Sequence, residues 1–443
     1  MSQSISKTFN FKSLVRFSLP TIVMMIFTSL YTIVDGMFVS RLVGTEALSA
    51  INITYPFLGL VIAIAIMFAS GGSAVVATQL GEGKKEDALK NFSLIVLTNF
   101  ILILLVSVLG ILFMDPLVRA LGAKDGLIGY SKDYLTVLLI FAPAYSLQLV
   151  LQSFYIVAGK PKLGLLISIL SGVTNAILDY VFMGPLGMGI AGAAYATAAG
   201  YLVSALFGLY FFSRSQSAIH FKRPSFHGEI LKQACFNGSS EMVTNLSTSV
   251  VTLLFNIFMM KHLGTEGVAA ITIVFYFQFL MVSLFMGYSM GVAPVISYNY
   301  GSKNYPHLKK IFKINWQFII GMSLVVFAAA QLLNHTVTKI FTPVGSSVYN
   351  LTIHGFALFA ISFIFAGINI YASSLFTALS NGKVSAIISF ARTLVFITLG
   401  IILLPMILGV DGIWWAVPFA EVCTLFITFY YVKKEMHLIF LGQ

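Results

Sequence analysis

Charged side chains are scarce in this chain of 443 residues. Asp, Glu, Lys and Arg make up only 9% of it, whereas hydrophobic residues make up 58%. Average soluble domains carry about 25% charged residues. This shortage excludes an ordinary soluble domain and indicates a chain that lies largely within a lipid bilayer.

Several signatures of chemistry are also missing. There is no phosphate-binding loop of the ATPase type, the seven His residues show no metal-ligand spacing, and two cysteines, Cys235 and Cys423, make no disulfide framework. The stretch from Gly187 to Gly192 fits the dinucleotide pattern, but it follows an apolar helix rather than a strand. We therefore expect no bound cofactor and no enzyme. A membrane-embedded transferase or hydrolase is the alternative from another class, although no nucleophile and base are visible for it.

Long apolar stretches are abundant, and each is long enough for a spanning helix of about 20 residues. The sequence predicts twelve: 15–39, 48–79, 91–113, 134–158, 163–183, 189–212, 231–260, 267–299, 311–333, 349–379, 384–408 and 410–432. They predict an all-α membrane protein. We expect an N-terminal lobe of six helices (1–213), a polar linker (214–228) and a C-terminal lobe of six helices (229–443).

An internal repeat relates the two lobes. Residues 40–92 recur without a gap at 260–312, with 13 of 53 positions identical at an offset of 220. Gly44 and Gly81 return as Gly264 and Gly301, at helix ends where glycine permits tight turns. Because each copy has an even number of spans, the two six-helix bundles have the same orientation, which is a parallel repeat.

Lys and Arg predict the orientation in the membrane. In the predicted topology, 19 of the 26 Lys and Arg residues lie on the side that holds the N-terminus, 6 lie on the other side, and Arg392 lies inside a helix. Both termini are therefore expected in the cytoplasm. The net charge of +11 reflects this topology, and we expect no nucleic-acid partner.

Ionisable residues inside spanning helices are costly and usually functional. In the N-terminal lobe, Asp35, Asn175, Asp179 and Thr197 are predicted to converge in its outer half. Two carboxylates, an amide and a hydroxyl suit Na⁺, and two close acids can equally hold a proton. Separate capping of each acid by backbone groups or water is the structural alternative. The repeat argues against it, since at the offset of 220 the counterparts of Asp35, Asp179 and Thr197 are Phe255, Leu399 and Val417.

The C-terminal lobe carries three other ionisable residues within helices. Arg392 and Glu421 are predicted to pair, because an unpaired buried charge is expensive. A contact with substrate is their alternative role. Glu241 is a candidate for contact with substrate or ion, or a structural acid.

The chain resembles the multidrug and toxic compound extrusion (MATE) family, in particular its DinF- and MepA-like branch. The resemblance rests on Asp35 to Val39 followed by Gly44 and Ala47–Ala50, on Gln152 to Gly159, on Asn175 to Asp179, and on Gly187 to Thr197. It implies a V-shaped pair of bundles that exports amphipathic, often cationic compounds in exchange for Na⁺ or H⁺. It also implies a cation site at Asp35, Asn175, Asp179 and Thr197, and bending of the first helix at Pro20. The NorM branch has an acid on the tenth helix, and this chain has none there, although Glu241 keeps its acid on the seventh.

The sequence therefore predicts a multidrug antiporter, a monomer that spans the cytoplasmic (inner) membrane. Its expected partners are small amphipathic cations and the lipid bilayer. A flippase for a lipid-linked oligosaccharide or a related amphiphile is the alternative, but such a protein needs several Arg or Lys in its cavity, and only Arg392 lies within a helix.

Overall fold

The computed structural model describes residues 5–123, 125–214 and 218–441, and helices account for nearly all of them. Within these ranges no strand is formed, in agreement with the predicted all-α class. The helices are α1 Phe11–Leu42, α2 Thr45–Gly81, α3 Lys85–Leu112, α4 Met114–Ala120, α5 Asp125–Val157, α6 Pro161–Met183, α7 Gly189–Arg214, α8 Gly228–Gly301, α9 Tyr305–Phe341, α10 Ser347–Phe359, η1 Ala360–Ser362, α11 Phe363–Ala378, α12 Gly382–Phe390, η2 Ala391–Val395, α13 Phe396–Leu408 and α14 Asp411–Leu441.

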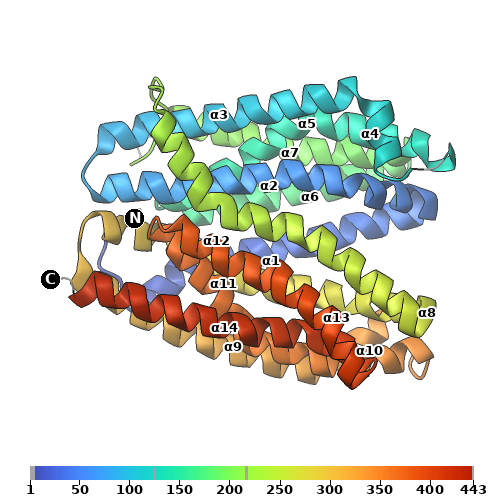
Figure 1. The fold of residues 1–443 in the computed structure, drawn as a ribbon. Helices are drawn as coiled ribbons and strands as arrows, with labels where there is room; N and C mark the ends of the chain where they lie inside the picture. Colours follow the sequence, from blue (N-terminus) through green and yellow to red (C-terminus); the bar gives the residue numbers. More distant parts are fainter. Residues whose placement is uncertain (1–4, 124, 215–217, 442–443) are drawn as a thin grey trace.

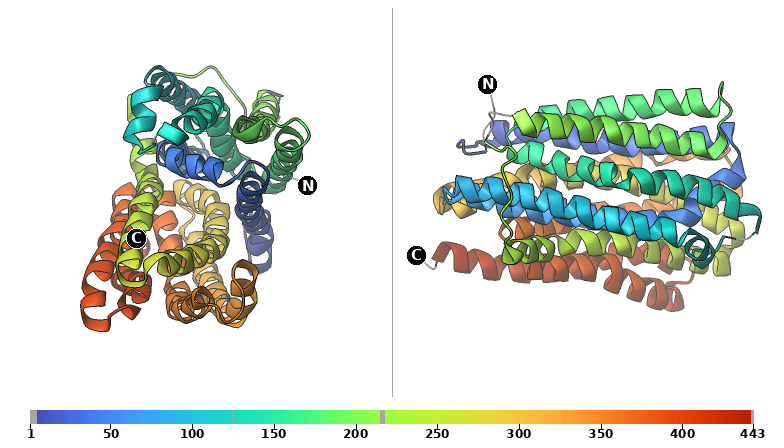
Figure 2. Two further views of the ribbon diagram at one scale, coloured as in Figure 1. Left: turned by 90° about the vertical axis from the view of Figure 1, so that its right-hand side faces the viewer. Right: turned by 90° about the horizontal axis from the view of Figure 1, so that it is seen from above.

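The helices form two bundles that lie side by side with nearly parallel axes (Figures 1 and 2). The N-terminal bundle contains α1 to α7 and the C-terminal bundle α8 to α14. The first and last described residues lie at the same end of the molecule (Figure 1), which we call the terminal face; the opposite end is the distal face. Eleven helices in the described ranges are long and apolar enough to cross a membrane, and one of them, α8, is 74 residues long.

The predicted spans 231–260 and 267–299 are both helical and lie within α8, which the non-helical residue Gly264, with φ of 64°, divides into two legs. Gly264 and its repeat partner Gly44, with φ of 120°, both have a left-handed backbone that favours glycine. The predicted span 134–158 begins nine residues earlier, at Asp125, because the polar residues that precede it continue the helix.

Other spans are helical but irregular. The predicted span 349–379 contains the short 3₁₀ turn η1 between α10 and α11. The predicted span 384–408 contains five residues of π-helix, η2, between α12 and α13. π-helical segments inside α-helices are rare overall, and those that occur often lie at functional sites.

The linker between the bundles is tied to α3. α7 ends at Arg214 and α8 begins at Gly228, and residues 215–217 lie outside the described residues. The backbone N–H of Lys222 donates to the Ser93 hydroxyl at 2.9 Å, and the Lys222 ammonium pairs with Glu86. The linker therefore packs on the N-terminal bundle at the terminal face.

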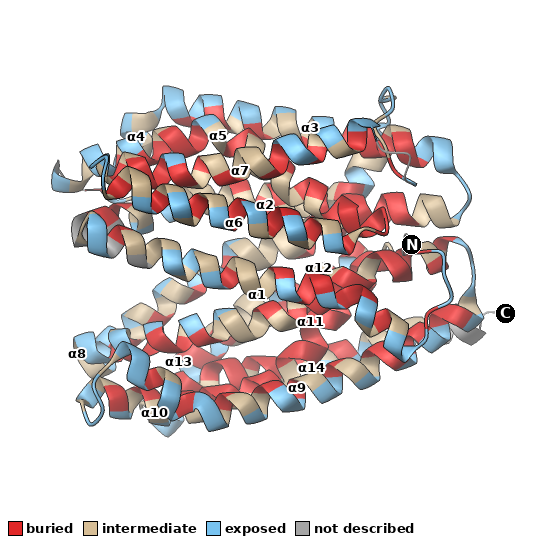
Figure 3. Cartoon of the chain, turned by 180° about the vertical axis from the view of Figure 1, so that it is seen from behind, coloured by how far each residue is buried: buried red, intermediate tan, exposed pale blue. Residues whose placement is uncertain are grey.

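The outer surface is apolar, as a bilayer requires. Buried residues line the interior of each bundle, and exposed residues follow its outside (Figure 3). Exposed large apolar side chains include Leu112, Leu332, Met406 and Phe426. In water these side chains would be costly, whereas lipid tails accept them.

The two bundles touch backbone to backbone near the terminal face. An added Cβ at Gly71 of α2 would lie 1.9 Å from the Ala234 carbonyl oxygen of α8. A Cβ at Gly81 would lie 2.0 Å from the Tyr298 carbonyl oxygen of the same helix. Only glycine permits so close an approach, so α2 is held against both legs of α8. Gly81 and Gly301 are the last residues of α2 and α8, as expected for glycines at helix ends. Neither has a positive φ, however, so glycine is required at both by the close crossing of the two helices and not by a tight turn.

Toward the distal face these close contacts stop. An added Cβ at Gly36, Gly44, Gly59 or Gly264 would meet no atom within 4 Å. At the terminal face, by contrast, the N–H of Phe9 also donates to His307 Nε2 of α9 at 3.1 Å. The bundles are therefore joined at the terminal face, and their ribbons diverge toward the distal face (Figure 1).

Candidate functional site

The N-terminal bundle brings together the four polar residues predicted from its sequence. Asp35 lies on α1, Asn175 and Asp179 lie one turn apart on α6, and Thr197 lies on α7. The Asn175 amide donates to the Thr197 hydroxyl at 3.4 Å. The carboxyl groups of Asp35 and Asp179 are neighbours that influence each other electrostatically, and Asn175 lies beside that of Asp179. We call these four residues the N-lobe site.

Small residues bring the three helices close enough for this convergence. A Cβ at Gly200 of α7 would lie 3.0 Å from the Ser171 carbonyl oxygen of α6, and the Ser171 hydroxyl donates to the Gly200 carbonyl at 2.7 Å. A Cβ at Gly172 of α6 would lie 2.6 Å from the Phe27 ring of α1. These contacts fix α6 between α1 and α7, and so set the positions of the side chains one or two turns further on.

The acids of the N-lobe site lack partners. Asp179 is 0% exposed, and neither of its carboxyl oxygens has a hydrogen-bond partner among the described residues. Oδ1 of Asp35 is also buried without a partner in those ranges. A buried carboxylate without a counter-charge is expensive. The donor set therefore fits a cation or a shared proton better than it fits two ordinary structural acids.

Three tyrosines that sequence analysis did not find lie near the N-lobe site. Tyr31, Tyr134 and Tyr201 interact electrostatically with Asp35. Tyr31 is four residues before Asp35 and so shares its helix face, which was a signal available in the sequence. The positions of Tyr134 and Tyr201 depend on how α5 and α7 are rotated, for which the sequence has no comparable signal.

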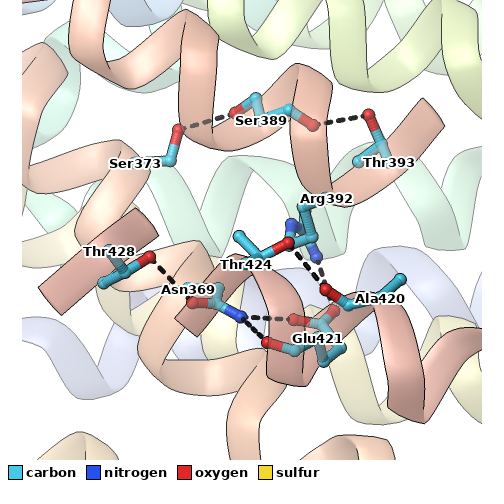
Figure 4. Close-up of polar contacts among 9 residues, drawn as sticks. All are labelled: Asn369, Ser373, Ser389, Arg392, Thr393, Ala420, Glu421, Thr424 and Thr428. Carbon is cyan, nitrogen blue, oxygen red and sulfur yellow. Dashed lines mark hydrogen bonds and ion pairs between the residues drawn. The ribbon is translucent and has the colours of Figure 1, made fainter. Parts of the chain in front are cut away.

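In the C-terminal bundle Arg392 and Glu421 form the predicted pair. Nη1 of Arg392 donates to Oε1 of Glu421 at 3.3 Å, and the two side chains are 13% and 5% exposed. The amide of Asn369 donates to Oε2 of Glu421 at 2.7 Å and to its carbonyl oxygen at 2.9 Å (Figure 4). The Thr428 hydroxyl in turn donates to Oδ1 of Asn369 at 2.8 Å. Sequence analysis missed Asn369 and Thr428, because nothing in the sequence pairs these positions across two helices.

The remaining predicted residues lie apart from these two clusters or at their edge. Glu241 on α8 interacts electrostatically with Arg392. Pro20 is buried within α1, which continues through it as one helix. Gly187 and Gly189, with φ of 58° and 60°, make the turn between α6 and α7 and follow no strand, so the dinucleotide pattern here is a helix connection.

In the described ranges no group of three or more His, Cys, Asp or Glu residues could hold a metal ion. Cys235 and Cys423 are free thiols on α8 and α14. A Na⁺ ion at the N-lobe site would accordingly rest on two carboxylates with an amide and a hydroxyl.

Two apolar helical bundles indicate a membrane protein, and buried carboxylates in such bundles are typical of ion and substrate pathways. The chain belongs to the MatE family, whose model matches residues 20–181 and 242–402. This match confirms the resemblance found in the sequence.

Known proteins are similar in sequence to this chain over nearly its whole length. The multidrug export protein MepA of Staphylococcus haemolyticus (strain JCSC1435) is 25% identical over 435 residues, which cover 95% of this chain and 93% of that protein. MepA of Staphylococcus saprophyticus is 26% identical over 438 residues, 94% of this chain and 92% of that one.

Solved structures have the same fold. A crystal structure of MATE in complex with MaL6 superposes with a TM-score of 0.92 at 24% identity, over 98% of each chain. MATE in its straight conformation also has a TM-score of 0.92, at 24% identity, over 98% of this chain and 97% of that one. The two-bundle, twelve-helix architecture predicted from the repeat is thereby confirmed.

Proposed function

We propose that this protein is a secondary multidrug exporter that exchanges amphipathic compounds for H⁺ or Na⁺. The observation that carries the proposal is Asp179, whose two carboxyl oxygens are buried and unpartnered beside Asp35. The names of the MepA relatives, which are multidrug export proteins, support the choice of cargo.

The N-lobe site would bind the coupling cation. Two neighbouring carboxylates in a low-dielectric interior repel each other, so the site favours the arrival of one positive charge. A proton would be held between Asp35 and Asp179. A Na⁺ ion would be held by carboxylate oxygens with the Asn175 amide oxygen and the Thr197 hydroxyl, which are hard ligands suited to it.

Transport requires that this binding changes the balance between two conformations. A cation shifts that balance only if it binds one conformation more tightly than the other. Asp35 and Pro20 lie on the same helix, α1, so a change at the site can be transmitted by bending of α1 at Pro20. The drug would leave on the distal side, where the bundles are separate, while the cation enters there.

The membrane arrangement follows from charge. Most Lys and Arg residues lie toward the terminal face, so we place that face in the cytoplasm and the distal face outside the inner membrane. We propose that the exporter acts as a monomer, since one chain supplies both bundles and all four residues of the N-lobe site.

Reconstitution in liposomes tests the proposal. A fluorescent cationic dye is followed under an imposed Na⁺ gradient and, separately, under an imposed pH gradient. We expect export by the unaltered protein under one of them and its loss in Asp35→Asn and Asp179→Asn. Because these carboxylates have no hydrogen-bond partners, removing their charge should leave the thermal unfolding temperature unchanged or raised. Asp133→Asn, an exposed acid of the same bundle, is the matched control and should transport normally.

Two results would refute the assignment. Normal gradient-driven export by both variants would exclude the acids as the coupling site. Absence of dye transport by folded, unaltered protein under either gradient would exclude the antiporter and favour a flippase, which the movement of a labelled lipid in the same vesicles would then reveal.

A further inference from the structure

Arg392 has donors that the protein does not use. A guanidinium carries five N–H groups. Arg392 makes one long hydrogen bond, from Nη1 to Glu421, and its Nε is buried with no partner among the described residues. A buried donor without an acceptor is costly, so a group that is absent from the chain itself should complete this site.

Glu421 cannot supply the missing acceptor. Its carboxylate is fixed by Asn369, which is itself held by Thr428, and its side chain is 5% exposed. Arg392 projects from the π-helical segment η2, between α12 and α13 (Figure 4). The Arg392–Glu421 pair is thus a neutral, rigid unit that keeps part of the guanidinium unsatisfied.

Glu241 supplies the opposite charge nearby. Its helix α8 packs against η2, the segment that carries Arg392, and the two side chains are near enough to influence each other electrostatically. The Glu241 carboxylate makes no hydrogen bond to another residue in the described ranges, although its backbone carbonyl accepts one from Asn245. Glu241 follows Gly238 by three residues and so shares its helix face. Gly238 packs against the backbone of Met67 on α2, where the two bundles meet. Because the Glu241 side chain, one turn further along, is partly exposed, a ligand between the bundles can reach it.

The depth of this pair suits a substrate. Glu241 is 13 residues beyond Gly228, roughly 20 Å along the helix at ~1.5 Å per residue. Arg392 is ten residues beyond Gly382, or roughly 15 Å. Both lie near the middle of a bilayer about 30 Å thick, the level at which transporters bind their cargo.

We propose that Arg392 and Glu241 form a binding site for zwitterionic amphiphiles, with the anionic group of the ligand at Arg392 and its ammonium group at Glu241. A ligand with only a cationic group would leave the guanidinium donors unsatisfied and would be repelled by them. A ligand with only an anionic group would leave Glu241 unpaired. A site built to hydrogen-bond one group discriminates strongly against analogues that lack it. This inference rests on the proposed function, since it specifies the substrate class of the exporter.

A matched pair of ligands tests the proposal. The probes are a fluoroquinolone carboxylic acid bearing a basic amine, which is a zwitterion, and its ethyl ester, which is a cation of nearly the same shape. Binding to the purified protein is measured from the probe's fluorescence, and uptake is measured in the liposomes described above. We expect the unaltered protein to bind the acid about tenfold more tightly than the ester, or more.

The variants separate the two ends of the ligand. Arg392→Gln should bring the two affinities to near parity by weakening the acid alone. Glu241→Gln should weaken acid and ester alike, because both carry the amine. Since Arg392→Gln leaves Glu421 without a counter-charge, the double variant Arg392→Gln with Glu421→Gln, which is neutral, provides a second test should the single variant fail to fold. Arg41→Gln, an exposed arginine of α1, is the control and should keep the preference.

The outcomes are distinguishable. Equal binding of acid and ester by the unaltered protein would overturn the inference, as would a preference that survives in both Arg392 variants. Failure of the proposed function would appear differently, as an absence of gradient-driven transport of every probe, the zwitterionic acid included, by the unaltered protein. The ratio of the two affinities, measured without a gradient, would still decide the role of Arg392.

Discussion

The crossing of α2 and α8 offers a direct test of how the two bundles are held together. A Cβ added at Gly301 would lie 2.1 Å from the Thr78 carbonyl oxygen and 2.9 Å from its carbonyl carbon. Ordinary contact begins near 3.4 Å, so Gly301→Ala is about 1.3 Å too close. The opposing atoms belong to a helix backbone, so they can withdraw only if α2 moves as a whole.

The magnitude follows from the cost of overpacking, which is typically about 1–3 kcal/mol. In this structure the terminal face is closed and Gly301 lies against Thr78, so the penalty falls on this conformation. A difference of about 1–3 kcal/mol changes the ratio of two conformations by roughly 5- to 150-fold. Gly301→Ala should therefore shift the protein toward a conformation that is open at the terminal face.

The separation of the bundles can be measured with spin labels. Lys162 of α6 and Lys383 of α12 are exposed, and each is the second residue of a helix that begins at the terminal face. Cysteines at these positions, in a chain with Cys235 and Cys423 replaced by alanine, carry the labels. Pulsed electron resonance should show one short distance for the parent chain and a larger fraction of long distances for Gly301→Ala.

The control is Gly59→Ala on α2, where an added Cβ meets no atom within 4 Å. This variant should keep the parent distribution and the parent thermal stability. An unchanged distance distribution in a folded Gly301→Ala protein would refute the reasoning, because it would mean that the glycine crossing does not hold the terminal face closed.

Two further predictions concern the C-terminal bundle. Glu421→Gln keeps the side chain's shape but leaves Arg392 buried without its counter-charge, so we expect the free energy of unfolding in detergent to fall by about 3 kcal/mol. Asn315→Leu removes the amide that accepts from the Tyr288 hydroxyl at 2.7 Å and donates to the Tyr371 hydroxyl at 2.9 Å. Since both hydroxyls are then unpaired in the interior, chemical unfolding should show a loss of about 2–4 kcal/mol.

Exposed positions provide the controls for both changes. Glu82→Gln removes one partner of the exposed Lys84–Glu82 pair, and it should alter stability by less than about 1 kcal/mol. Asn350→Leu, at an exposed position of α10, should be similarly mild. Equal effects at the exposed and buried sites would contradict the argument, because burial is the cause assigned to the difference.

The architecture could be predicted because membrane helices leave a strong record in the sequence. A stretch of about 20 apolar residues is needed for each crossing, and the offset of 220 relates residues 40–92 of one lobe to residues 260–312 of the other. The sequence repeat is matched by a repeat in the backbone, since Gly44 and Gly264 both have a left-handed conformation at the equivalent bend of each lobe. The early start of α5 at Asp125 was not predictable in this way, because polar residues outside the membrane can continue a helix without any apolar signal.

The site could be predicted only in part. Asp35 and Asp179 stand out because ionisable residues in apolar stretches are rare. Asn369, in contrast, is one polar residue among many, and its contact with Glu421 depends on the rotation of α11 against α14. The π-helical segment η2 was equally out of reach, since one extra residue in a turn changes no hydrophobic pattern.

The two bundles share their backbone design and differ in their electrostatics. In the C-terminal bundle the acid Glu421 has a fixed guanidinium beside it, so its charge is balanced in every conformation that keeps the pair. In the N-terminal bundle Asp35 and Asp179 have each other as neighbours and no such partner. An acid with a permanent counter-charge needs no cation from solution, so its occupancy cannot respond to an ion gradient. Two acids without a counter-charge bind a cation from solution, so their occupancy can respond to the gradient. Duplication would then have left one bundle free to respond to the cation and the other to hold its cargo, and loss of coupling in Asp179→Asn with retained affinity for a zwitterion is the result that this division of roles requires.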